Sequence, residues 1–464
     1  MSFKRRTIWF LIIITLPLLS YFTVNTKAHR FSNSALANEL AGNGLYELFA
    51  AYLNNELDYD QFYQRMDEDK AFQQVRQLLK TKESHFIDSS SFSLQRRIVA
   101  NGPELKKNVI LISVESFSAD FMKSFGNEEN ITSFLDSLAL HSRLYTQLYA
   151  TGTRTVRGLE ALSLCVPPTP GQSIVRRPNN ENLFTLGRVF KEKGYESKYI
   201  YGGYGYFDNM SYFFSHNNYD VVDRVELKDE EIDYENIWGV ADENLFDLAT
   251  REIEKTINKN KPIFAQIMTT SNHRPYTYPD GRIDIPSHTG RDGAVKYTDY
   301  AIGQFVRRIS KKPWFKNTVL IIVADHCASS AGKTELPVNK YHIPMLVYAP
   351  GFIAPGTMDR LMSQIDIGPT LLGLLNFSYK SKFFGYDMAK LEPGRERAFV
   401  STYQILGYMK GEELVVLMPQ QELKYFTLRG NEQIEHTQVD STLLQEAISW
   451  YQTASTSFKN GWMN

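Results

Sequence analysis

Acidic and imidazole side chains follow three short apolar runs of this 464-residue chain. Glu115 comes directly after VILISV, His273 comes soon after PIFAQIM, and Asp325 and His326 come directly after VLIIVA. Carboxylates combined with an imidazole are ligands of divalent cations, and manganese, magnesium and zinc all suit this set. Each residue taken alone also has a simpler explanation, such as an ion pair for Glu115 or the capping of a strand by Asp325 and His326.

A second candidate is the hydroxyl-rich segment TGTRTVRGLEALSL at residues 151–164, which precedes an apolar helical pattern. The N-terminus of a helix attracts phosphate or sulfate, and Arg154 and Arg157 would add charge-assisted donors there. A threonine activated by a metal can attack phosphorus and form a covalent intermediate. The alternative is a threonine that only caps the helix.

The elements that would position these groups belong to an α/β fold. Short apolar runs at 109–114, 262–268 and 319–324 are typical of strands buried on both faces of a parallel sheet. Amphipathic stretches at 184–195 and 297–312 predict helices between them. Ligands of such sheets bind beyond the carboxyl ends of the strands, so groups far apart in sequence are expected to converge there.

The N-terminus carries an uncharged run at residues 7–26 that follows three basic residues at 4–6. This length suits one membrane-spanning helix, and the basic residues predict that the rest of the chain lies outside the cytoplasm. We expect an uncleaved, single-pass anchor in the cell membrane; a cleaved signal peptide is the alternative.

The remaining sequence divides by pattern. Residues near 30–98 are polar and helix-forming, whereas the chain from about residue 396 has short strand-like runs and a final helical stretch. The predicted parts are a tip and anchor at 1–28, a helical linker at 29–100, a catalytic domain at 101–394, and a small antiparallel sheet with a helix at 395–464.

Composition excludes several classes of protein. Lys+Arg number 51 against 52 Asp+Glu, so the net charge of −1 gives no reason to expect a nucleic-acid partner. Two cysteines, Cys165 and Cys327, are too few for a disulfide framework or a cysteine-built zinc module. A single disulfide and two free buried thiols are both open interpretations.

Taken together, the motifs resemble the lipoteichoic acid synthase branch of the sulfatase and alkaline phosphatase superfamily. The resemblance spans roughly residues 30–464 and rests on motifs that occur in the family's order: NVILISVESF, TGTRTVRGLEAL, SNHRPY, IIVADH, YHIPMLVYAPG and SQIDIGPTLLGLL. It implies a mixed, mainly parallel sheet between helices, followed by a smaller C-terminal antiparallel sheet.

The resemblance also implies roles for individual residues. Glu115, Asp325 and His326 match the metal ligands, and Thr155 matches a nucleophile that also contacts the metal, with Thr153 as its rival. The metal implied is a divalent ion, with manganese favoured over magnesium or zinc. His273 matches a substrate-binding histidine that protonates the leaving group or activates the acceptor.

Two further residues are candidates for substrate contact. His342, in KYHIP, is expected either to face the same crevice or simply to begin a strand. In lipoteichoic acid synthases a tryptophan and an arginine help to hold glycerol phosphate. Here the segment FDNMSYFF places Asp208 and Met210 at the nearest positions, and Asn209 between them is the expected contact. Those synthases also usually carry five membrane helices, whereas this sequence predicts one.

The activity implied is transfer of phosphoglycerol from a phosphatidylglycerol-type donor, through Thr155, to a glycan or polyol-phosphate acceptor of the cell envelope. The alternatives are a phosphoethanolamine transferase, a phosphodiester or sulfatase-type hydrolase, and a non-catalytic envelope-binding protein. Sulfatases mature a C-x-P-x-R pentapeptide, and the segment that begins at Cys165, CVPPT, lacks its arginine.

Overall fold

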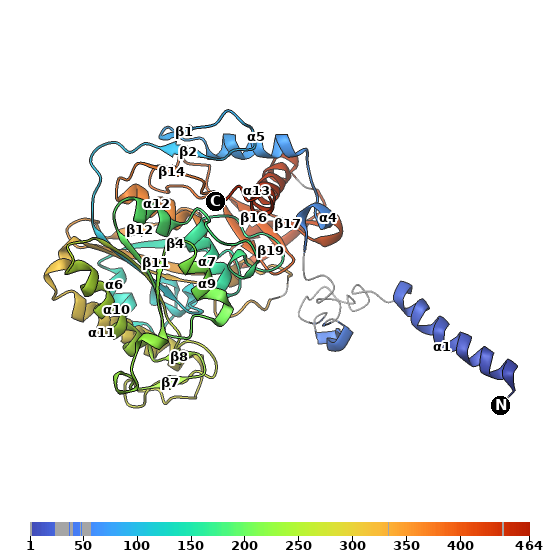
Figure 1. Ribbon diagram of the computed structural model, residues 1–464, viewed down its shortest axis with the longest axis horizontal. Helices are drawn as coiled ribbons and strands as arrows, with labels where there is room; N and C mark the ends of the chain where they lie inside the picture. The colour runs from blue at the N-terminus through green and yellow to red at the C-terminus, as the bar shows by residue number, and fades with distance from the viewer. Residues whose placement is uncertain are drawn as a thin grey trace.

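The computed structural model describes residues 2–23, 37, 40–46, 48, 57–332, 334–438 and 440–464 (Figure 1). Within these residues, a nine-stranded sheet has the order β12-β4-β11-β10-β3-β9-β5-β6, with β13 paired to β4. Its strands are β3 (Asn108–Val114), β4 (Arg143–Tyr149), β5 (Glu196–Tyr201), β6 (Asp220–Val222), β9 (Ile263–Met268), β10 (Thr318–Ala324), β11 (His342–Tyr348), β12 (Gly356–Met358) and β13 (Met362–Ser363).

The three predicted strands are confirmed as β3, β9 and β10, at the centre of this sheet. All of their residues are buried, as their uninterrupted apolar sequence requires. The strands β10, β3, β9, β5 and β6 run parallel, whereas β11 is antiparallel to β10 and to β4. The sheet is therefore mixed, and its parallel part carries the predicted site residues.

Helices pack around the sheet in two groups. The helices α10 and α11 pack together and α10 contacts β5 and β9, while α8 contacts β5 and α7 lies against α8 and α12. The helices of the body are α6 (Ser133–Ala139), α7 (Thr155–Leu164), α8 (Leu186–Glu192), α9 (Met210–Ser215), α10 (Asp242–Ile257), α11 (Arg291–Ile309) and α12 (Ile367–Leu374).

Both helices predicted from periodicity are present, with different limits. The first is α8, and Gly194 just beyond its end has a φ of +86°, which favours glycine. The second is α11, which begins at Arg291, six residues before the predicted start. Gly290 is its N-cap residue, and Asp292 lies in its first turn.

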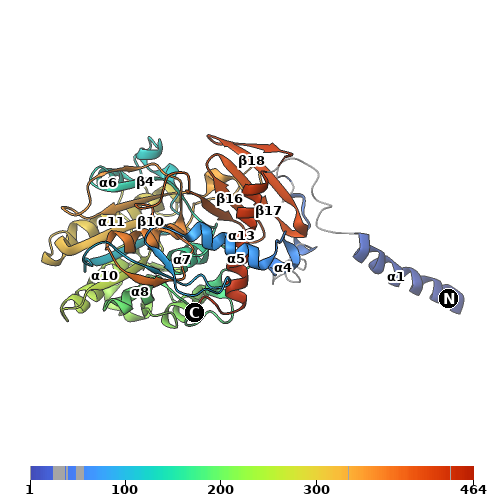
Figure 2. The same cartoon turned by 90° about the horizontal axis from the view of Figure 1, so that it is seen from above.

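The C-terminal part forms a separate antiparallel sheet, as predicted, in the order β15-β16-β17-β18-β19. Figure 2 shows this sheet beside the central one, with a closing helix, α13. These elements are β15 (Ala398–Ser401), β16 (Leu406–Lys410), β17 (Glu413–Leu417), β18 (Leu423–Arg429), β19 (Glu432–His436) and α13 (Ser441–Lys459).

The N-terminal region contains a helix that stands apart from the body, α1 (Phe3–Thr23) (Figure 1). Among the residues described, no helix combines the length and the apolar composition needed to cross a bilayer. The predicted anchor is thus not confirmed. Residues 24–36 and 49–56, which belong to the predicted anchor and linker, lie outside the described residues.

Residues 57–98 pack against the end of the chain. The helix α5 contacts α13, and a three-stranded sheet pairs β2 with both β1 and β14. The described half of the predicted linker is thus part of the folded body, while the division of the chain into domains stays a prediction. The elements are α4 (Tyr59–Phe62), α5 (Glu68–Leu79), β1 (Ser84–Phe86), β2 (Arg96–Ile98) and β14 (Tyr379–Ser381).

A buried ion pair joins the residue before β15 to the turn between β13 and α12. Arg397, just before β15, donates from Nη1 to Oδ1 and Oδ2 of Asp366 at 2.9 and 2.7 Å. Its Nη2 donates to the carbonyl of Phe384 at 3.0 Å, and its guanidinium lies 4.2 Å from the ring centroid of Tyr386. Both charged side chains are almost fully buried, so each depends on the other for compensation.

We predict that Arg397→Met destabilises the protein by about 3–5 kcal/mol, because the Asp366 carboxylate is left buried without its cation. The measurement is the free energy of unfolding from denaturant titration. The control is Lys82→Met, which breaks an exposed pair with Glu392 and should cost no more than about 1 kcal/mol. Equal losses in the two variants would contradict the role given to Arg397.

Candidate active site

Two acidic residues meet where neighbouring parallel strands end. Val114 of β3 lies opposite Ala324 of β10, so Glu115 and Asp325 leave the sheet at the same level. The amide of Ser116 donates to Oδ1 of Asp325 at 2.8 Å and ties the two strand ends together. This register brings together side chains that are 210 positions apart, as the strand pattern predicts.

Glu115, Asp325 and His326 form a buried cluster whose ligand atoms lie within 4.8 Å of one another. His326 Nε2 is 3.7 Å from Glu115 Oε1 and 3.5 Å from Asp325 Oδ2. His326 Nδ1 lies 2.7 Å from the carbonyl of Cys327, a contact that places the proton on Nδ1 and leaves the Nε2 lone pair facing the carboxylates.

The donor set fits a divalent cation. Asp325 Oδ2 is buried and has no hydrogen-bond partner among the described residues, as expected for an oxygen that faces a metal. Two carboxylates and one imidazole offer oxygen and nitrogen ligands to such an ion. Manganese, magnesium and zinc are all compatible with this set.

The charges of the cluster are strongly interdependent. Burial, followed by the charge of Glu115, raises the pKa of Asp325 well above its ordinary value. Burial alone would also raise the pKa of Glu115, but His326, His273 and hydrogen bonds from Ser116 and Thr155 bring it below its ordinary value. Burial lowers the pKa of His326, which keeps the imidazole neutral and available as a ligand.

Thr155 is the first residue of α7, and its hydroxyl donates to Glu115 Oε2 at 3.0 Å. The helix approaches the cluster closely because Gly158, one turn later, has no side chain. A Cβ built there would lie 2.3 Å from the carbonyl oxygen of Asp325. In the described part of the chain, the hydroxyl of the rival Thr153 has no hydrogen bond to the cluster.

His273 lies at the rim of the cluster, with Nε2 4.0 Å from Glu115 Oε1 and about a third of its side chain exposed. Its ring stacks on Trp238 with the centroids 3.6 Å apart. Trp238 covers one face of the His273 ring. The Nε2 edge of the ring lies near Glu115 and is partly open to solvent. The geometry suits a group that exchanges protons with a bound substrate.

The two candidate arginines have different environments. Arg154 is exposed at the N-cap position of α7, next to Thr155. Arg157 is buried, and donates to Glu160 Oε1 at 2.9 Å and to the carbonyls of Thr169 and Gly171 at 2.6 and 2.5 Å. Its Nη1 and Nη2 donors are thus directed into the protein, and a contact of Arg157 with substrate stays a prediction that these hydrogen bonds do not support.

Asn209 and His342 are not brought to the cluster. The side-chain amide of Asn209 donates to the carbonyl of Val175 at 2.8 Å. His342 begins β11, with Nε2 2.7 Å from the carbonyl of Thr146 and its ring against Phe125 and Tyr149. These contacts support the interpretation of His342 as a strand-start residue and give neither side chain a role at the site.

The two cysteines are free thiols. Both are buried, and burial raises the pKa of Cys327 to about 12, so neither is a reactive thiolate. Cys327 Sγ donates to the carbonyl of His342 at 3.1 Å. Of the two open interpretations, the structure favours the free thiols.

Three residues near the cluster escaped the sequence analysis. Ser116 donates to Glu115 Oε1 at 2.6 Å and follows it directly in the sequence, which is a signal that could have been used. Arg291 has a buried Nη1 without a partner among the described residues, and its charge helps to lower the pKa of His326. Trp238 lies in a two-residue turn of a hairpin, where no periodic pattern marks it.

Comparison with known proteins shows which family and fold the chain shares. The family model named Sulfatase matches residues 107–377. The solved structure of a protein in the alkaline phosphatase superfamily from Vibrio parahaemolyticus is 34% identical, with a TM-score of 0.81 over 87% of this chain and 99% of that one. The lipoteichoic acid synthase LtaP of Listeria monocytogenes, at 19% identity and a TM-score of 0.66, covers 84% of this chain and 98% of its own and shares the fold.

Similar curated sequences carry two names. Phosphoglycerol transferase I of Xanthomonas axonopodis pv. citri is 27% identical over 246 residues, which are 50% of this chain and 35% of that protein. Lipoteichoic acid synthase 1 of Bacillus subtilis is 25% identical over 318 residues, 61% of this chain and 48% of its own. The aligned part is therefore less than half the length of each of these relatives.

We predict that Asp325→Asn raises the thermal stability of the metal-free protein at alkaline pH. The variant removes one of two facing carboxylates, while the side-chain amide oxygen it introduces can still accept from the amides of Ser116 and His326. Added Mn²⁺ should raise the melting temperature of the wild type by several degrees, and that of the variant by much less. Thermal unfolding with and without Mn²⁺ measures both effects.

The same variant has a defined pH dependence. Because the pKa of Asp325 is raised in the folded state, the metal-free wild type loses stability as pH rises through that pKa. Asp325→Asn should lack this loss, and the exposed Asp120→Asn should retain it. A wild-type stability that rises with pH over the same range would show that Asp325 is not held protonated.

Proposed function

The chain belongs to the sulfatase family, and on that premise we propose that it is a metal-dependent phosphoglycerol transferase. The donor is a phosphatidylglycerol-type lipid, and the acceptor is a hydroxyl of a glycan or polyol phosphate. The observation that carries the proposal is the Thr155 hydroxyl, held 3.0 Å from Glu115 within a cluster that suits a divalent cation. The names of the similar phosphoglycerol transferases and lipoteichoic acid synthases support the group transferred.

The proposed reaction is a double displacement. Thr155 Oγ1 forms a bond to phosphorus while the bond from phosphorus to the diacylglycerol oxygen breaks. The acceptor hydroxyl then forms its own bond to phosphorus and releases Thr155. Glu115, Asp325, His326 and Thr155 would hold a divalent cation, which when bound offsets phosphate charge and favours the threonine alkoxide.

His273 and Arg154 have supporting roles in this proposal. His273 gives a proton to the leaving diacylglycerol oxygen in the first step and takes one from the acceptor hydroxyl in the second. Its position at the rim, 4.0 Å from Glu115, supports this exchange. Arg154, exposed beside Thr155, is placed to pair with a non-bridging phosphate oxygen.

We also propose that residues 7–26 anchor the chain in the cell membrane, with the catalytic body outside the cytoplasm. The support is the sequence alone, in which an uncharged run follows basic residues at 4–6. Such an anchor would keep the site near a lipid donor.

Release of diacylglycerol from labelled phosphatidylglycerol in Mn²⁺ tests the proposal. Thr155→Ala should lower the rate by about a thousand-fold or more, because the attacking oxygen is lost. Thr153→Ala, a matched loss of a hydroxyl two residues away, should change it by less than about three-fold. Removal of the metal with a chelator should abolish release, and Mn²⁺ should restore it.

The outcomes separate the proposal from its alternatives. Release that survives Thr155→Ala would remove Thr155 as the nucleophile. Threonine-dependent release from phosphatidylethanolamine but not from phosphatidylglycerol would identify a phosphoethanolamine transferase. Threonine-dependent release with water as the only acceptor would identify a phosphodiester hydrolase.

A further inference from the structure

The segments before four adjacent parallel strands of the central sheet are strongly basic. The ten residues before β3, β5, β9 and β10 are residues 98–107, 186–195, 253–262 and 308–317. Together they carry twelve lysines and arginines against three glutamates, in a chain whose net charge is −1. We call these four segments the basic edge. Positive charge is thus concentrated at the end of the sheet where these strands begin.

Helix ends account for only a small part of this charge. The helices α8, α10 and α11 finish within the basic edge, and the C-terminus of a helix carries about half a negative elementary charge. Three such ends offset roughly 1.5 positive charges. The basic side chains exceed the acidic ones by nine, so most of the excess is free to act on a partner.

Hydrogen bonds join the four segments into one surface. Lys107 Nζ donates to Asn317 Oδ1 at 3.4 Å, and the Tyr195 hydroxyl donates to the carbonyl of Lys107 at 2.8 Å. The amide of Glu196 donates to the carbonyl of Pro262 at 3.0 Å. These contacts link the segments in turn, so their positive charges share one continuous face.

A hollow of about 680 Å³ opens in the basic edge, between the ends of α8 and α10. Five lysines and four carboxylates line it. Glu196 lies 3.4 Å from Lys259 and 3.6 Å from Lys261, and Glu252 also contacts two lysines. Because one carboxylate offsets only one of two ammonium groups, each of these clusters keeps a net positive charge.

Four exposed lysines of the basic edge form no ion pair with any residue that the structure describes. They are Lys106, Lys191, Lys311 and Lys316. An ammonium on a flexible stem binds a phosphate oxygen as a point charge and does not need a fixed geometry from its partner. Phosphate groups spaced along a flexible chain suit such a surface.

We propose that the basic edge binds an anionic phosphodiester polymer and holds it by several phosphates at once. The identity of the polymer rests on the proposed function, because each transfer of phosphoglycerol adds one phosphodiester, and one negative charge, to the acceptor. An acceptor that has been substituted several times is therefore a polyanion. The basic edge keeps such an acceptor on the protein between transfers.

The basic edge and the metal cluster lie at opposite ends of the same strands. The strand β3 has seven residues, and each residue of a strand advances about 3.3 Å, so the two ends are about 20 Å apart. This separation exceeds the screening distance of about 8 Å at physiological ionic strength. The basic edge therefore acts on where the polymer is held and not on the chemical step.

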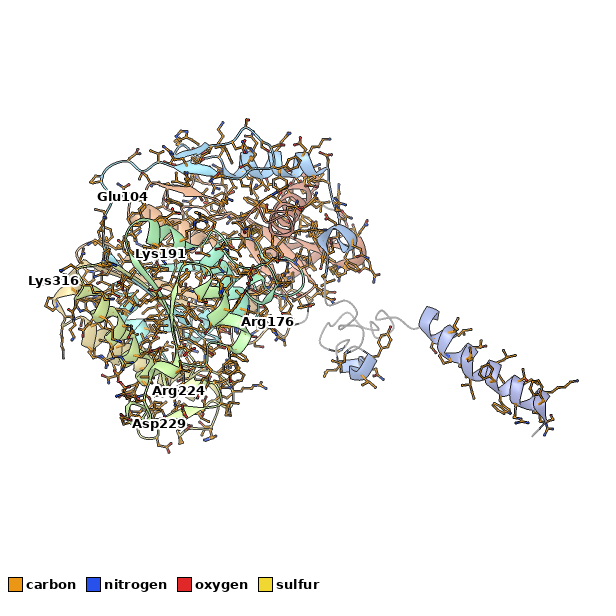
Figure 3. All side chains as sticks on the ribbon, viewed as in Figure 1. Glu104, Arg176, Lys191, Arg224, Asp229 and Lys316 are labelled. Carbon is orange, nitrogen blue, oxygen red and sulfur yellow. The ribbon has the colours of Figure 1, made fainter. Side chains whose placement is uncertain are left out.

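Negative charge elsewhere on the protein directs a polyanion to this surface. Residues 223–235 follow β6 and run into the hairpin of β7 (Glu235–Asn236) and β8 (Gly239–Val240), with seven carboxylates against two basic side chains. Figure 3 shows Asp229 of this segment at the bottom of the molecule and Lys316 at the left of the body. A polyanion is repelled by the first region and attracted to the second.

An anionic bilayer is the competing partner, and two observations favour the polymer. Lys316 lies at the left of the body in Figure 3, whereas α4, the first helix of the body after the proposed anchor, lies at the right in the same view (Figure 1). The hollow between α8 and α10 also admits a flexible chain, whereas a flat bilayer does not enter it.

Binding of poly(glycerol phosphate) freed of its lipid tests the proposal without turnover. Isothermal titration into the full chain in detergent should detect binding at low salt, and the affinity should fall steeply as NaCl is raised, because binding releases counterions. The double variant Lys191→Gln, Lys316→Gln should weaken the affinity by about ten-fold or more. The control is Lys80→Gln, Lys380→Gln, which changes the net charge equally at two exposed lysines outside the basic edge. Its affinity should change by less than about two-fold.

The second measurement compares two acceptors in phosphoglycerol transfer, an oligosaccharide that carries several phosphoglycerol groups and the same oligosaccharide without them. The variant Lys191→Gln, Lys316→Gln should raise the KM of the substituted acceptor by about ten-fold. It should change the KM of the unsubstituted acceptor, and kcat with either one, by less than about two-fold, because the two lysines do not contact the reacting atoms.

The results distinguish this inference from the proposed function. Failure of poly(glycerol phosphate) to bind at low salt, or equal losses in the two double variants, would overturn the polymer site. Binding of phosphatidylglycerol vesicles that depends on Lys191 and Lys316, with no polymer binding, would assign the basic edge to a bilayer and also overturn it. Polymer binding that depends on these lysines, without any donor cleavage, would remove the transferase proposal and leave the polymer site in place.

Discussion

Glu115 and Asp325 are held side by side at the ends of adjacent parallel strands, where water cannot screen one charge from the other. The pairing of β3 with β10 imposes this arrangement, and it is unfavourable unless positive charge or hydrogen-bond donors compensate for it. The hydroxyls of Ser116 and Thr155 donate to Glu115, whereas His326 turns the unprotonated Nε2 toward the two carboxylates. The site therefore holds buried negative charge on Glu115 and Asp325 that its hydrogen bonds only partly compensate. A divalent cation would compensate the rest.

The C-terminal region also contributes to this arrangement. Gln364 donates from Nε2 to the carbonyl of Asp325 at 2.8 Å and accepts from the amide of Thr151 at 3.2 Å. Ser401 of β15 donates to the carbonyl of Thr151 at 2.7 Å, and Tyr341 donates to the carbonyl of Ser401 at 3.0 Å. The loop before α7 and the loop after β10 are therefore held by one network that includes the second sheet.

Much of the fold and the metal cluster could be predicted because their signals are local. Strands buried on both faces have continuous apolar sequences, and the residue that follows such a strand reaches the functional edge, as with Glu115 and Asp325. The internal partners of Arg157, Glu160 and the carbonyls of Thr169 and Gly171, could not be predicted, because they depend on how the chain folds back over α7. Trp238 was missed because a short turn has no periodicity, and only the tertiary structure stacks it on His273.

The close approach of α7 to the strand end has a consequence for how this enzyme family can diversify. At Gly158 the main chain of α7 contacts the main chain of Asp325. A substitution of Gly158 therefore cannot adjust the position of Thr155 without moving the whole helix. A change in the surroundings of the cluster is easier to accommodate in nearby loops such as residues 202–209, 234–240 and 273–290, where the main chain is not in contact with α7. Substitutions in these loops could change what lies next to the cluster while the main-chain contact at Gly158 keeps Thr155 in place.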